Sequence, residues 1–458
     1  MKCSRKCVRT KENAIPQLRF EDQRLTSFAG LVVLQKFFQI IGLKAQLQKC
    51  FRHRALGKVF DRTTIFMQLI VHLLLGFREL RDCDHYRDDP MVQRLLGLKR
   101  LPDVATLSRM LKEADEKSVS KLRQLLADMV LDRIASLALP RITLDFDGSV
   151  QSTGRRAEGT AVGFNKKKKG ARSYYPLFCT VAQTGQVLTF LHRSGNVHDS
   201  NGAQAFILSC VEQVRSVLPG VIIEVRMDSA FFSDEIVTAL NEQTVEFSIS
   251  VPFERFVELK KKIEKRQRWF ELNQDVSYFE SEWKPKSWQR RCRFLMIRTK
   301  TKKQQKGPVQ LDLFEPYVYG FEFKVIVTNK LLGAAGVVSY HEGRGSQEGV
   351  FAELKSHCQM GYIPVRTRRG NQLFLLAGLF AFNLVRDLQM QMEPPQRTTT
   401  RKRTPLWAFE RVDTLRKTVF QRAGRLTRPA GALILTFCAG KNLKQRVSQI
   451  FESLDTAA

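Results

Sequence analysis

Asp147 and Asp228 each end a short segment in which apolar and polar residues alternate. The segments are Ile142–Asp147 and Val221–Asp228, and alternation of this kind predicts a β-strand with one polar face. Carboxylates at the carboxyl ends of two neighbouring parallel strands would converge at one edge of a sheet. Two carboxylates that close repel each other, and a divalent cation relieves the repulsion. Hard oxygen ligands select Mg²⁺ or Mn²⁺, so the pair predicts a site for such a metal ion.

A second metal ion would need a third carboxylate, and Glu348 is the candidate. It lies in the segment 339–357, which has the periodicity of a helix. On that helix Arg344, Glu348 and Lys355 would share one stripe, with Leu354 on the buried side. The two cations would keep the Glu348 carboxylate ionised and close to phosphates. A surface ladder of ion pairs has the same spacing and is the alternative interpretation.

Other carboxylates lie close to these three in the sequence. Asp145 points to the same side of its strand as Asp147 and is an alternative metal ligand. Asp147 is favoured because a Gly-Ser turn follows it directly. Glu342 and Glu353 fall off the stripe of Glu348, which predicts that water surrounds them.

The composition points to a polyanionic partner. The chain has 458 residues and a net charge of +30, which favours nucleic acid. An acidic membrane surface is the competing partner, but the longest apolar run, Ile65–Phe77, is too short to span a bilayer. The basic N-terminus has no apolar signal segment. Nine scattered cysteines without a CxxC pair favour a reducing compartment over a disulfide framework or a zinc site.

The pattern divides the chain into five stretches. Residues 1–138 are helical and are expected to bind DNA, since residues 1–60 hold 13 Lys and Arg against 3 acids. The helix Val104–Ala114 would carry Arg109 outward, either as a DNA recognition helix or as an ordinary surface helix. The remaining stretches are a core in two parts (139–251 and 336–392), a β-rich basic insertion (252–335) and a basic C-terminal tail (393–458). The tail starts as a flexible linker and continues with two short amphipathic helices, expected around Phe409–Gln421 and Lys444–Leu454.

The core has a recognisable order of elements. From residue 141 the pattern is strand, strand, strand, helix, strand, helix, strand. This order is typical of the ribonuclease H-like fold, a mixed five-stranded sheet with flanking helices. In that fold the first and fourth strands lie side by side, which would bring Asp147 beside Asp228. The predicted class is therefore α/β, with a β insertion and a helical N-terminal region.

Two basic stretches lie between the carboxylates. A lysine run in a loop either stays solvated or touches a DNA backbone. Its members are Lys166, Lys167, Lys168 and Lys169. The insertion sets three tryptophans among Arg and Lys, a mixture that suits nucleic-acid contact, although the tryptophans could equally pack the core of the insertion. They are Trp269, Trp283 and Trp288.

These motifs resemble those of the DDE transposases of bacterial insertion sequences. The third acidic residue of one superfamily of these enzymes sits in a Tyr-x2-Arg-x3-Glu-x6-Lys signature. The spacing of Arg344, Glu348 and Lys355 fits it. His341 occupies the place of the tyrosine, and Tyr340 lies one residue farther from Arg344 than the signature asks.

The resemblance extends over roughly residues 60–390 and is greatest to the insertion-sequence group numbered thirteen-eighty. The turn after Asp147 resembles the first acidic motif of the family. Val225–Phe232 resembles the second, and Ser194–Asp199 matches a segment between the two. A β insertion between the second and third acids also matches.

The resemblance implies a mechanism and partners. Asp147, Asp228 and Glu348 would be catalytic and would hold two Mg²⁺ (or Mn²⁺) ions, while Arg344 and Lys355 would hold phosphates near the cut. Water or a DNA 3′-hydroxyl would attack a phosphodiester. The implied partners are double-stranded DNA, as terminal inverted repeats and target, and a second copy in a homodimer, in the bacterial cytoplasm at the nucleoid. A non-catalytic DNA-binding copy and a host nuclease of the same fold are the rival interpretations.

Overall fold

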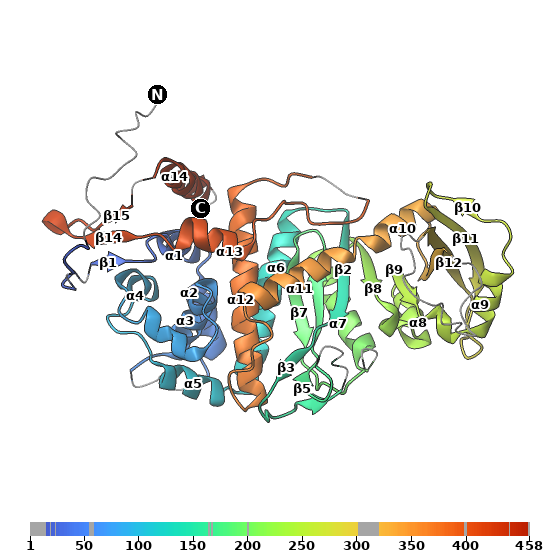
Figure 1. The fold of residues 1–458 in the computed structure, drawn as a ribbon, viewed down its shortest axis with the longest axis horizontal. Helices are drawn as coiled ribbons and strands as arrows, with labels where there is room; N and C mark the ends of the chain where they lie inside the picture. Colours follow the sequence, from blue (N-terminus) through green and yellow to red (C-terminus); the bar gives the residue numbers. More distant parts are fainter. Residues whose placement is uncertain are drawn as a thin grey trace.

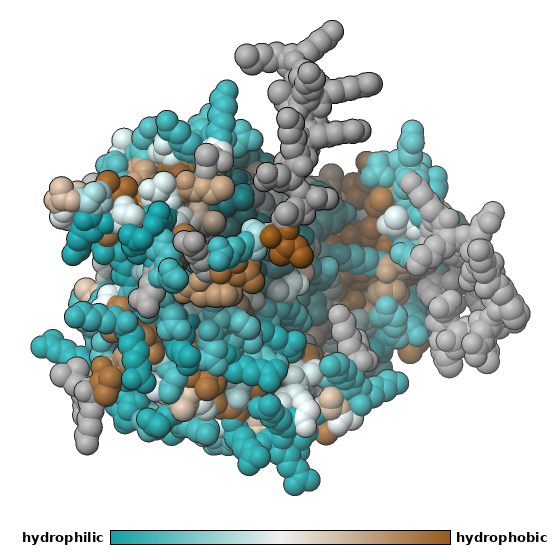
Figure 2. Space-filling view, turned by 60° about the vertical axis from the view of Figure 1, so that its left-hand side comes forward, coloured by the Kyte–Doolittle hydropathy of each residue, from teal (hydrophilic) through white to brown (hydrophobic). Residues whose placement is uncertain are grey.

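The structure is a computed structural model of the chain. It describes residues 15–18, 20–22, 24–54, 59–163, 165, 168–198, 201–300, 320–397, 401–438 and 440–456. A helical region, a large mixed sheet with helices, and a strand-rich end follow one another along the long axis of the molecule (Figure 1). Hydrophilic residues predominate on the face drawn in Figure 2, where hydrophobic residues form small scattered patches.

Helices build the N-terminal region. They are α1 (Leu31–Ile40), α2 (Leu43–Phe51), α3 (Arg62–Leu74), α4 (Pro90–Leu96), α5 (Val104–Lys112) and α6 (Glu116–Ser136). Four of them begin after an aspartate whose carboxylate accepts a hydrogen bond from a backbone N–H of the first turn, namely Asp61, Asp89, Asp103 and Asp115. Each cap satisfies an N–H that the helix itself leaves unpaired. The helix predicted to begin at Val104 is confirmed as α5.

The described residues form one central sheet of nine strands, in the order β10-β11-β12-β13-β9-β8-β2-β6-β7. The strands are β2 (Arg141–Gly148), β6 (Leu177–Val181), β7 (Gln186–Leu191), β8 (Ile222–Met227), β9 (Glu246–Val251), β10 (Phe270–Glu271), β11 (Val276–Trp283), β12 (Cys292–Lys300) and β13 (Phe321–Thr328). The pairs β2–β8 and β8–β9 are parallel, and the other neighbouring pairs are antiparallel. The strand of Asp147 thus lies beside the strand that precedes Asp228, as the sequence predicts.

The sheet is larger than the five strands expected. Strand β13 pairs with β9 from Val325↔Val251 to Thr328↔Ser248, so the strands of the insertion continue the core sheet. An edge strand offers a row of unpaired backbone groups that another strand can join. Alternation in a sequence identifies a strand but not the edge it joins, which is why the insertion looked separate from the core.

The two faces of the sheet differ in polarity. Leu144 and Phe146 of β2 are buried in a cluster with α7 (Ala203–Val217) and α8 (Asp234–Glu242), where the rings of Phe146 and Phe206 meet at 5.9 Å. The helices α10 (Ala334–Glu342) and α11 (Gly345–His357) cross the sheet (Figure 1). Phe351 of α11 packs on Phe178 of β6 at 5.4 Å between ring centroids. This second face carries the polar residues of β2 and β8.

The tryptophans of the insertion serve its own core. Trp283 and Trp288 are buried, and Trp269 packs edge-on against Phe279 at 4.8 Å between ring centroids. The basic helix α9 (Val257–Glu264) lies beside them, where Trp283 donates a hydrogen bond to Glu258 at 3.0 Å. Of the two alternatives that the sequence left open for these tryptophans, the structure shows packing.

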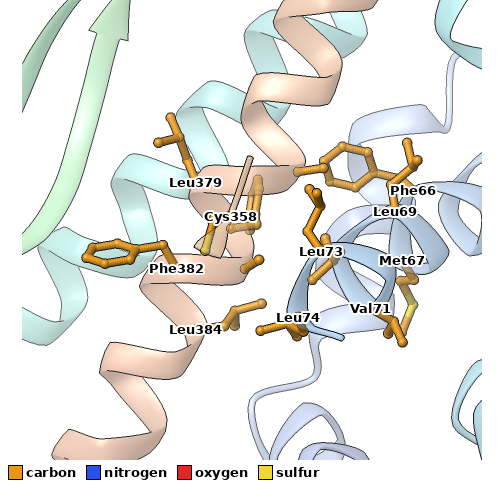
Figure 3. Packing of buried hydrophobic residues seen from close by; sticks show 14 of the residues in the cluster. Phe66, Met67, Leu69, Val71, Leu73, Leu74, Cys358, Leu379, Phe382 and Leu384 are labelled. Carbon is orange, nitrogen blue, oxygen red and sulfur yellow. The ribbon is translucent and has the colours of Figure 1, made fainter. Parts of the chain in front are cut away.

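Helix α12 (Arg368–Met392) joins the N-terminal region to the sheet. Phe380 of α12 meets Phe66 of α3 edge-on at 5.8 Å, within a cluster of apolar side chains from both helices (Figure 3). On its other side Asn383 bonds the edge strand β7, accepting from the Val187 N–H at 3.0 Å and donating to the Val187 carbonyl at 2.8 Å. Of the described helices, α12 is the one long and apolar enough to cross a membrane, but 94% of its apolar window is buried inside the structure, as in a core helix.

A small second sheet follows β2. Its strands are β3 (Gln151–Thr153), β4 (Ala161–Val162) and β5 (Arg172–Tyr174), in the order β3-β5-β4. The Gln151 side chain donates to the Met360 carbonyl at 2.8 Å, which ties this sheet to the turn between α11 and α12.

The chain from residue 401 onward packs against the rest of the molecule, and the part around Lys402 is not the flexible linker expected. Its elements are α13 (Val412–Leu415), β14 (Gly424–Thr427), β15 (Ile434–Phe437) and α14 (Lys441–Thr456). Strand β14 pairs with both β15 and β1 (Leu25–Thr26), and α14 packs on α1 and α12. The apolar residues Trp407, Phe420 and Leu454 are buried there. The two helices expected around Phe409–Gln421 and Lys444–Leu454 are found, the first as α13 with the helical turn Arg416–Phe420 that follows it and the second as α14.

A buried ionic cluster ties the C-terminal segment to the sheet. The Glu224 side chain of β8 is fully buried and lies 2.7 Å from Lys330, 3.0 Å from Arg403 and 3.1 Å from Arg141. Thr143 donates to it at 2.8 Å. Burial raises the pKa of the Glu224 carboxyl, but Lys330 and Arg403 outweigh burial and lower the pKa to about 2. The ionised carboxylate therefore holds the C-terminal segment against β8.

We expect this cluster to make the folded state sensitive to acid. A carboxyl with a pKa of about 2 when folded and 4.5 ordinarily contributes stability that is complete above pH 4.5 and lost as the pH falls toward 2. Glu224→Gln should therefore lower the free energy of unfolding at neutral pH and remove a pH dependence on the order of 3 kcal/mol from this window. Urea unfolding at a series of pH values measures both effects. Glu212→Gln, on the exposed side of α7, is the control. If the free energy of unfolding depends on pH in the same way in the wild type and in Glu224→Gln, the stabilising role of the Glu224 carboxylate is contradicted.

Candidate active site

Asp147 lies near the carboxyl end of β2, and Asp228 directly follows β8. The parallel pairing of β2 with β8 runs from Arg141↔Ile222 to Phe146↔Met227, and each aspartate is the next residue of the chain after this pairing. Both side chains are half-buried. The structure therefore brings together the first two carboxylates that the sequence singled out, at the carboxyl ends of adjoining parallel strands, where sites in α/β proteins are commonly built.

Each aspartate is oriented by the turn that follows it. Oδ1 of Asp147 accepts a hydrogen bond from the Gly148 N–H at 2.7 Å. Oδ1 of Asp228 accepts from the Ala230 N–H at 2.9 Å and caps the short 3-10 turn Ser229–Phe231. A carboxylate that accepts one backbone N–H keeps lone pairs for other partners.

The start of α11 lies against the end of β2. The side-chain amide of Gln347 donates to the Asp145 carbonyl at 3.0 Å. Nη1 of Arg344 lies 3.5 Å from Oδ2 of Asp147, and both side chains are about one-fifth exposed (21% and 22%). Glu348 follows Gln347 in the first turn of α11 and is exposed. The third predicted carboxylate is thus carried by the helix that contacts the first.

The helix expected over 339–357 is two helices, α10 and α11. Hydrogen bonds between them span three residues, from the Ser346 N–H to the Gly343 carbonyl and from the Gln347 N–H to the Arg344 carbonyl. The backbone of Gly343 packs so closely on the Lys402 carbonyl that a Cβ on Gly343 would lie 1.7 Å from that oxygen. The C-terminal segment therefore meets the chain at the break between the two helices, a contact that a helical pattern in the sequence could not reveal.

Asp145 is the partner of Arg226. The guanidinium holds both carboxylate oxygens, with Nε–Oδ1 at 2.6 Å and Nη2–Oδ2 at 2.8 Å, and both side chains are inaccessible to solvent. Burial lowers the pKa of Arg226, but the carboxylate of Asp145 outweighs burial and raises it. Arg226 also donates to the carbonyls of Tyr340 and Lys402, at 2.9 and 2.6 Å. A carboxylate committed to both arms of one guanidinium is a structural group, which separates Asp145 from Asp147.

The Arg226 pairing was not predicted, although the sequence contains a signal for it. Arg226 precedes Asp228 by two residues, as Asp145 precedes Asp147. Once two parallel strands are aligned by their final aspartates, the residues two positions earlier are also neighbours on the same face.

The three carboxylates are chemically suited to a divalent cation. Within the described ranges, no three His, Cys, Asp or Glu side chains lie close enough together to hold a metal ion. Asp147 and Asp228 supply paired oxygen ligands of the kind that Mg²⁺ accepts. Glu348, the third predicted carboxylate, is exposed to solvent. The guanidinium of Arg344 is the positively charged group next to Asp147.

His341, which stands at the tyrosine position of the resembled signature, is a structural residue. Its two ring nitrogens are each 2.9 Å from a hydroxyl of β9, those of Ser248 and Ser250. Burial lowers the pKa of His341 well below its usual value, and the nearby cations of Lys324 and Arg344 lower it further. The ring is therefore neutral and anchors α10 to β9.

The remaining predicted site residues that the structure describes are all exposed. Lys355 is exposed on α11, Lys168 and Lys169 are exposed in the loop before β5, and Arg109 is exposed on the outer side of α5. Lys166 and Lys167 fall outside the described residues.

Glu342 of α10 and Glu353 of α11 differ in their exposure to solvent. Glu342 is exposed, as expected, and lies 3.0 Å from Lys402. The prediction that water surrounds Glu353 is wrong, because Glu353 is buried in an ion pair with Arg386 of α12 at 2.5 Å. Its other oxygen accepts from the Val412 N–H at 2.7 Å. The partners come from distant parts of the chain, so the helical stripe alone could not identify them.

Comparisons with known proteins identify the family of the chain. A family model described as transposase DDE domain group 1 matches residues 9–458. Among curated proteins, none matches the sequence. The chain is similar to a solved synaptic complex of piggyBac transposase with hairpin DNA, with 12% identity and a TM-score of 0.42 over 92% of this chain and 85% of that one. It is also similar to a Mos1 mariner paired-end complex with Mn, with 11% identity and a TM-score of 0.17 over 43% and 60%. The match to the family model covers nearly the whole sequence, and the chain therefore belongs to the transposase DDE domain group 1 family.

Proposed function

We propose that the chain is a transposase that cleaves DNA strands at the terminal inverted repeats of an insertion sequence and joins them to target DNA. One observation carries the proposal. Asp147 and Asp228 end adjoining parallel strands in register, and the helix that contacts Asp147 through Arg344 also carries Glu348. Three carboxylates on these elements, in a member of a DDE family, are the groups that metal-assisted phosphodiester chemistry requires.

We also propose a fold family and an insertion-sequence group for the chain. The strand order β7-β6-β2-β8-β9, with β2 parallel to β8, supports a ribonuclease H-like core extended by an insertion. The spacing of Arg344, Glu348 and Lys355 supports the signature of the insertion-sequence group thirteen-eighty. We propose residues 1–138 as the terminal-repeat-binding region, in a bacterial protein that acts at the nucleoid.

Asp147, Asp228 and Glu348 would hold two Mg²⁺ or Mn²⁺ ions. When bound, such ions supply charge stabilisation and an acidified nucleophile for in-line attack on a phosphodiester. The first turn of α11 would approach the aspartates to bring Glu348 into the set. Arg344 would leave Oδ2 of Asp147 and pair with a phosphate, because a guanidinium binds either anion in the same forked geometry. Lys355 would hold a phosphate farther along α11 as a point charge.

The proposed partners are duplex DNA and a second copy of the chain. The net charge of +30 supports a polyanion. A homodimer on paired DNA ends would allow two ends to be cut and joined together.

A strand-joining assay tests the proposed function. The substrates are a labelled duplex made from the DNA that flanks the gene and an unlabelled plasmid target, in Mg²⁺. We expect cleavage of the labelled end and its covalent transfer into the plasmid. Cleavage without transfer would show a nuclease, and binding without cleavage would show a non-catalytic DNA-binding protein. Either result would reject the transposase proposal.

A further inference from the structure

Two segments distant in the sequence form one basic surface. Exposed cations come from the small sheet and its loops and from the turn between α11 and α12. We call this surface the basic platform, and its defining residues are Arg155, Arg156, Lys168, Lys169 and Arg366. Between residues 150 and 175 the sequence holds seven Lys and Arg and one acid.

Backbone contacts fix the two segments to each other. The Glu158 N–H donates to the Arg366 carbonyl at 2.7 Å, and the Arg368 N–H donates to the Glu158 carboxylate at 3.0 Å. The Arg368 guanidinium donates to the His192 carbonyl at 2.7 Å. The one acid of the small-sheet segment is thus used to hold the backbone together, and the platform cations keep their charge.

The lysine loop is tied to the same sheet. The side-chain amide of Asn165 donates to the Ser152 hydroxyl at 2.7 Å, and its oxygen accepts from the Lys168 N–H at 3.0 Å. Ser152 lies in β3, which begins directly beyond the turn that follows Asp147. The platform therefore starts beside the candidate active site and is ordered by contacts that do not involve its charged groups.

The platform cations are not neutralised within the protein. In the part of the chain that the structure describes, no carboxylate lies within ion-pair distance of any of the five. Like charges gathered on one surface repel one another, and a polyanion relieves that repulsion. Arg and Lys side chains presented by strands and turns are the groups that contact DNA phosphates without reading bases.

We propose that the basic platform binds the sugar–phosphate backbone of duplex DNA next to the position of cleavage. Binding of the backbone follows from the charges and their fixed geometry. The position next to the cut rests on the proposed function, because it takes Asp147 as the reacting site. The platform would carry the duplex from the carboxylates toward the N-terminal region, where Arg369 at the start of α12 pairs with Glu116 of α6 at 3.3 Å.

The test measures how DNA affinity depends on salt in the full-length protein. The platform variant combines Arg155→Gln, Arg156→Gln and Arg366→Gln. Anisotropy of a labelled duplex of arbitrary sequence gives the association constant over a series of KCl concentrations. Each lost phosphate contact should reduce the slope of log K against log [salt] by about 0.9, so we expect a reduction of roughly 2 to 3 and binding at low salt weaker by about tenfold or more.

A matched control removes the same charge elsewhere. Lys286, Arg290 and Arg291 are exposed on the insertion, and changing all three to Gln gives an equal loss of net charge. We expect the control to keep most of the wild-type slope. The variant Arg155→Lys, Arg156→Lys, Arg366→Lys should also keep it, since a phosphate contact needs the charge and not the guanidinium shape. An unchanged slope in the platform variant, or an equal reduction in the control, would overturn the proposal.

Ethylation interference on the cleavable duplex tests the position of the platform. Modified phosphates flanking the cut should weaken wild-type binding and have no further effect on the platform variant. Interference only at phosphates distant from the cut would overturn the placement. A protein that binds DNA through the platform but neither cleaves nor joins it would leave the platform supported and reject the proposed function, so the two failures are distinguishable.

Discussion

We expect Asp228→Asn to reduce strand cleavage by roughly 1,000-fold or more, because a metal site of this kind supplies several kcal/mol of transition-state stabilisation. The substitution keeps the size of the side chain. An amide oxygen can still accept the Ala230 N–H that orients residue 228. DNA affinity and the urea midpoint should therefore remain those of the wild type, and the loss should appear in the rate of cleavage alone.

Asp234→Asn is the matched control for this experiment. Asp234 is also half-buried, lies at the start of α8 soon after Asp228, and accepts from Thr238 at 3.5 Å within its own helix. It should cleave DNA as the wild type does. Cleavage by Asp228→Asn at the rate of Asp234→Asn would reject the assignment of Asp228 and, with it, the pairing of Asp147 and Asp228 as metal ligands.

The position of the two aspartates could be predicted from the sequence because it depends on local patterns. Alternation identifies β2 and β8 as half-polar strands, and the order of elements predicts that they are neighbours. The structure confirms the pairing, with Phe146 opposite Met227. It also confirms Leu354 on the buried side of α11.

The other features of the fold and the site depend on contacts between segments that are distant in the sequence. The hydrophobic periodicity of one segment carries no information about such contacts. Glu353 is buried because Arg386 of α12 and the backbone of Val412 meet it. The break between α10 and α11 lies where the Lys402 carbonyl packs on Gly343. In each case a residue more than thirty positions away, or a segment that looked like a linker, supplies the partner. Local propensity describes a segment on its own, and such contacts override it.

We expect Arg226→Ala to lower the free energy of unfolding by about 3 to 5 kcal/mol, which is the cost of removing one partner from a buried ion pair. The Asp145 carboxylate would remain inaccessible to water without a counter-charge. The carbonyls of Tyr340 and Lys402 would lose their guanidinium donor as well. Urea unfolding at neutral pH measures the loss. Arg446→Ala removes a surface partner of Glu410 whose pair is 28% and 42% exposed, and it should cost less than about 1 kcal/mol.

A double variant separates the ion pair from the packing around it. Replacing the pair by apolar residues, Arg226→Met with Asp145→Leu, removes the buried charge together with its partner. The double variant should therefore be more stable than Arg226→Ala, although the orphaned carbonyls keep it below the wild type. If Arg226→Ala and Arg446→Ala cost the same, Arg226 does not hold the sheet, α10 and the C-terminal segment together. If the double variant is no more stable than Arg226→Ala, the loss arises from the carbonyl contacts and not from the stranded carboxylate. The first outcome would contradict the structural role of Arg226, and the second would assign it to the junction at Gly343, where the C-terminal segment meets the start of the helix that carries Glu348.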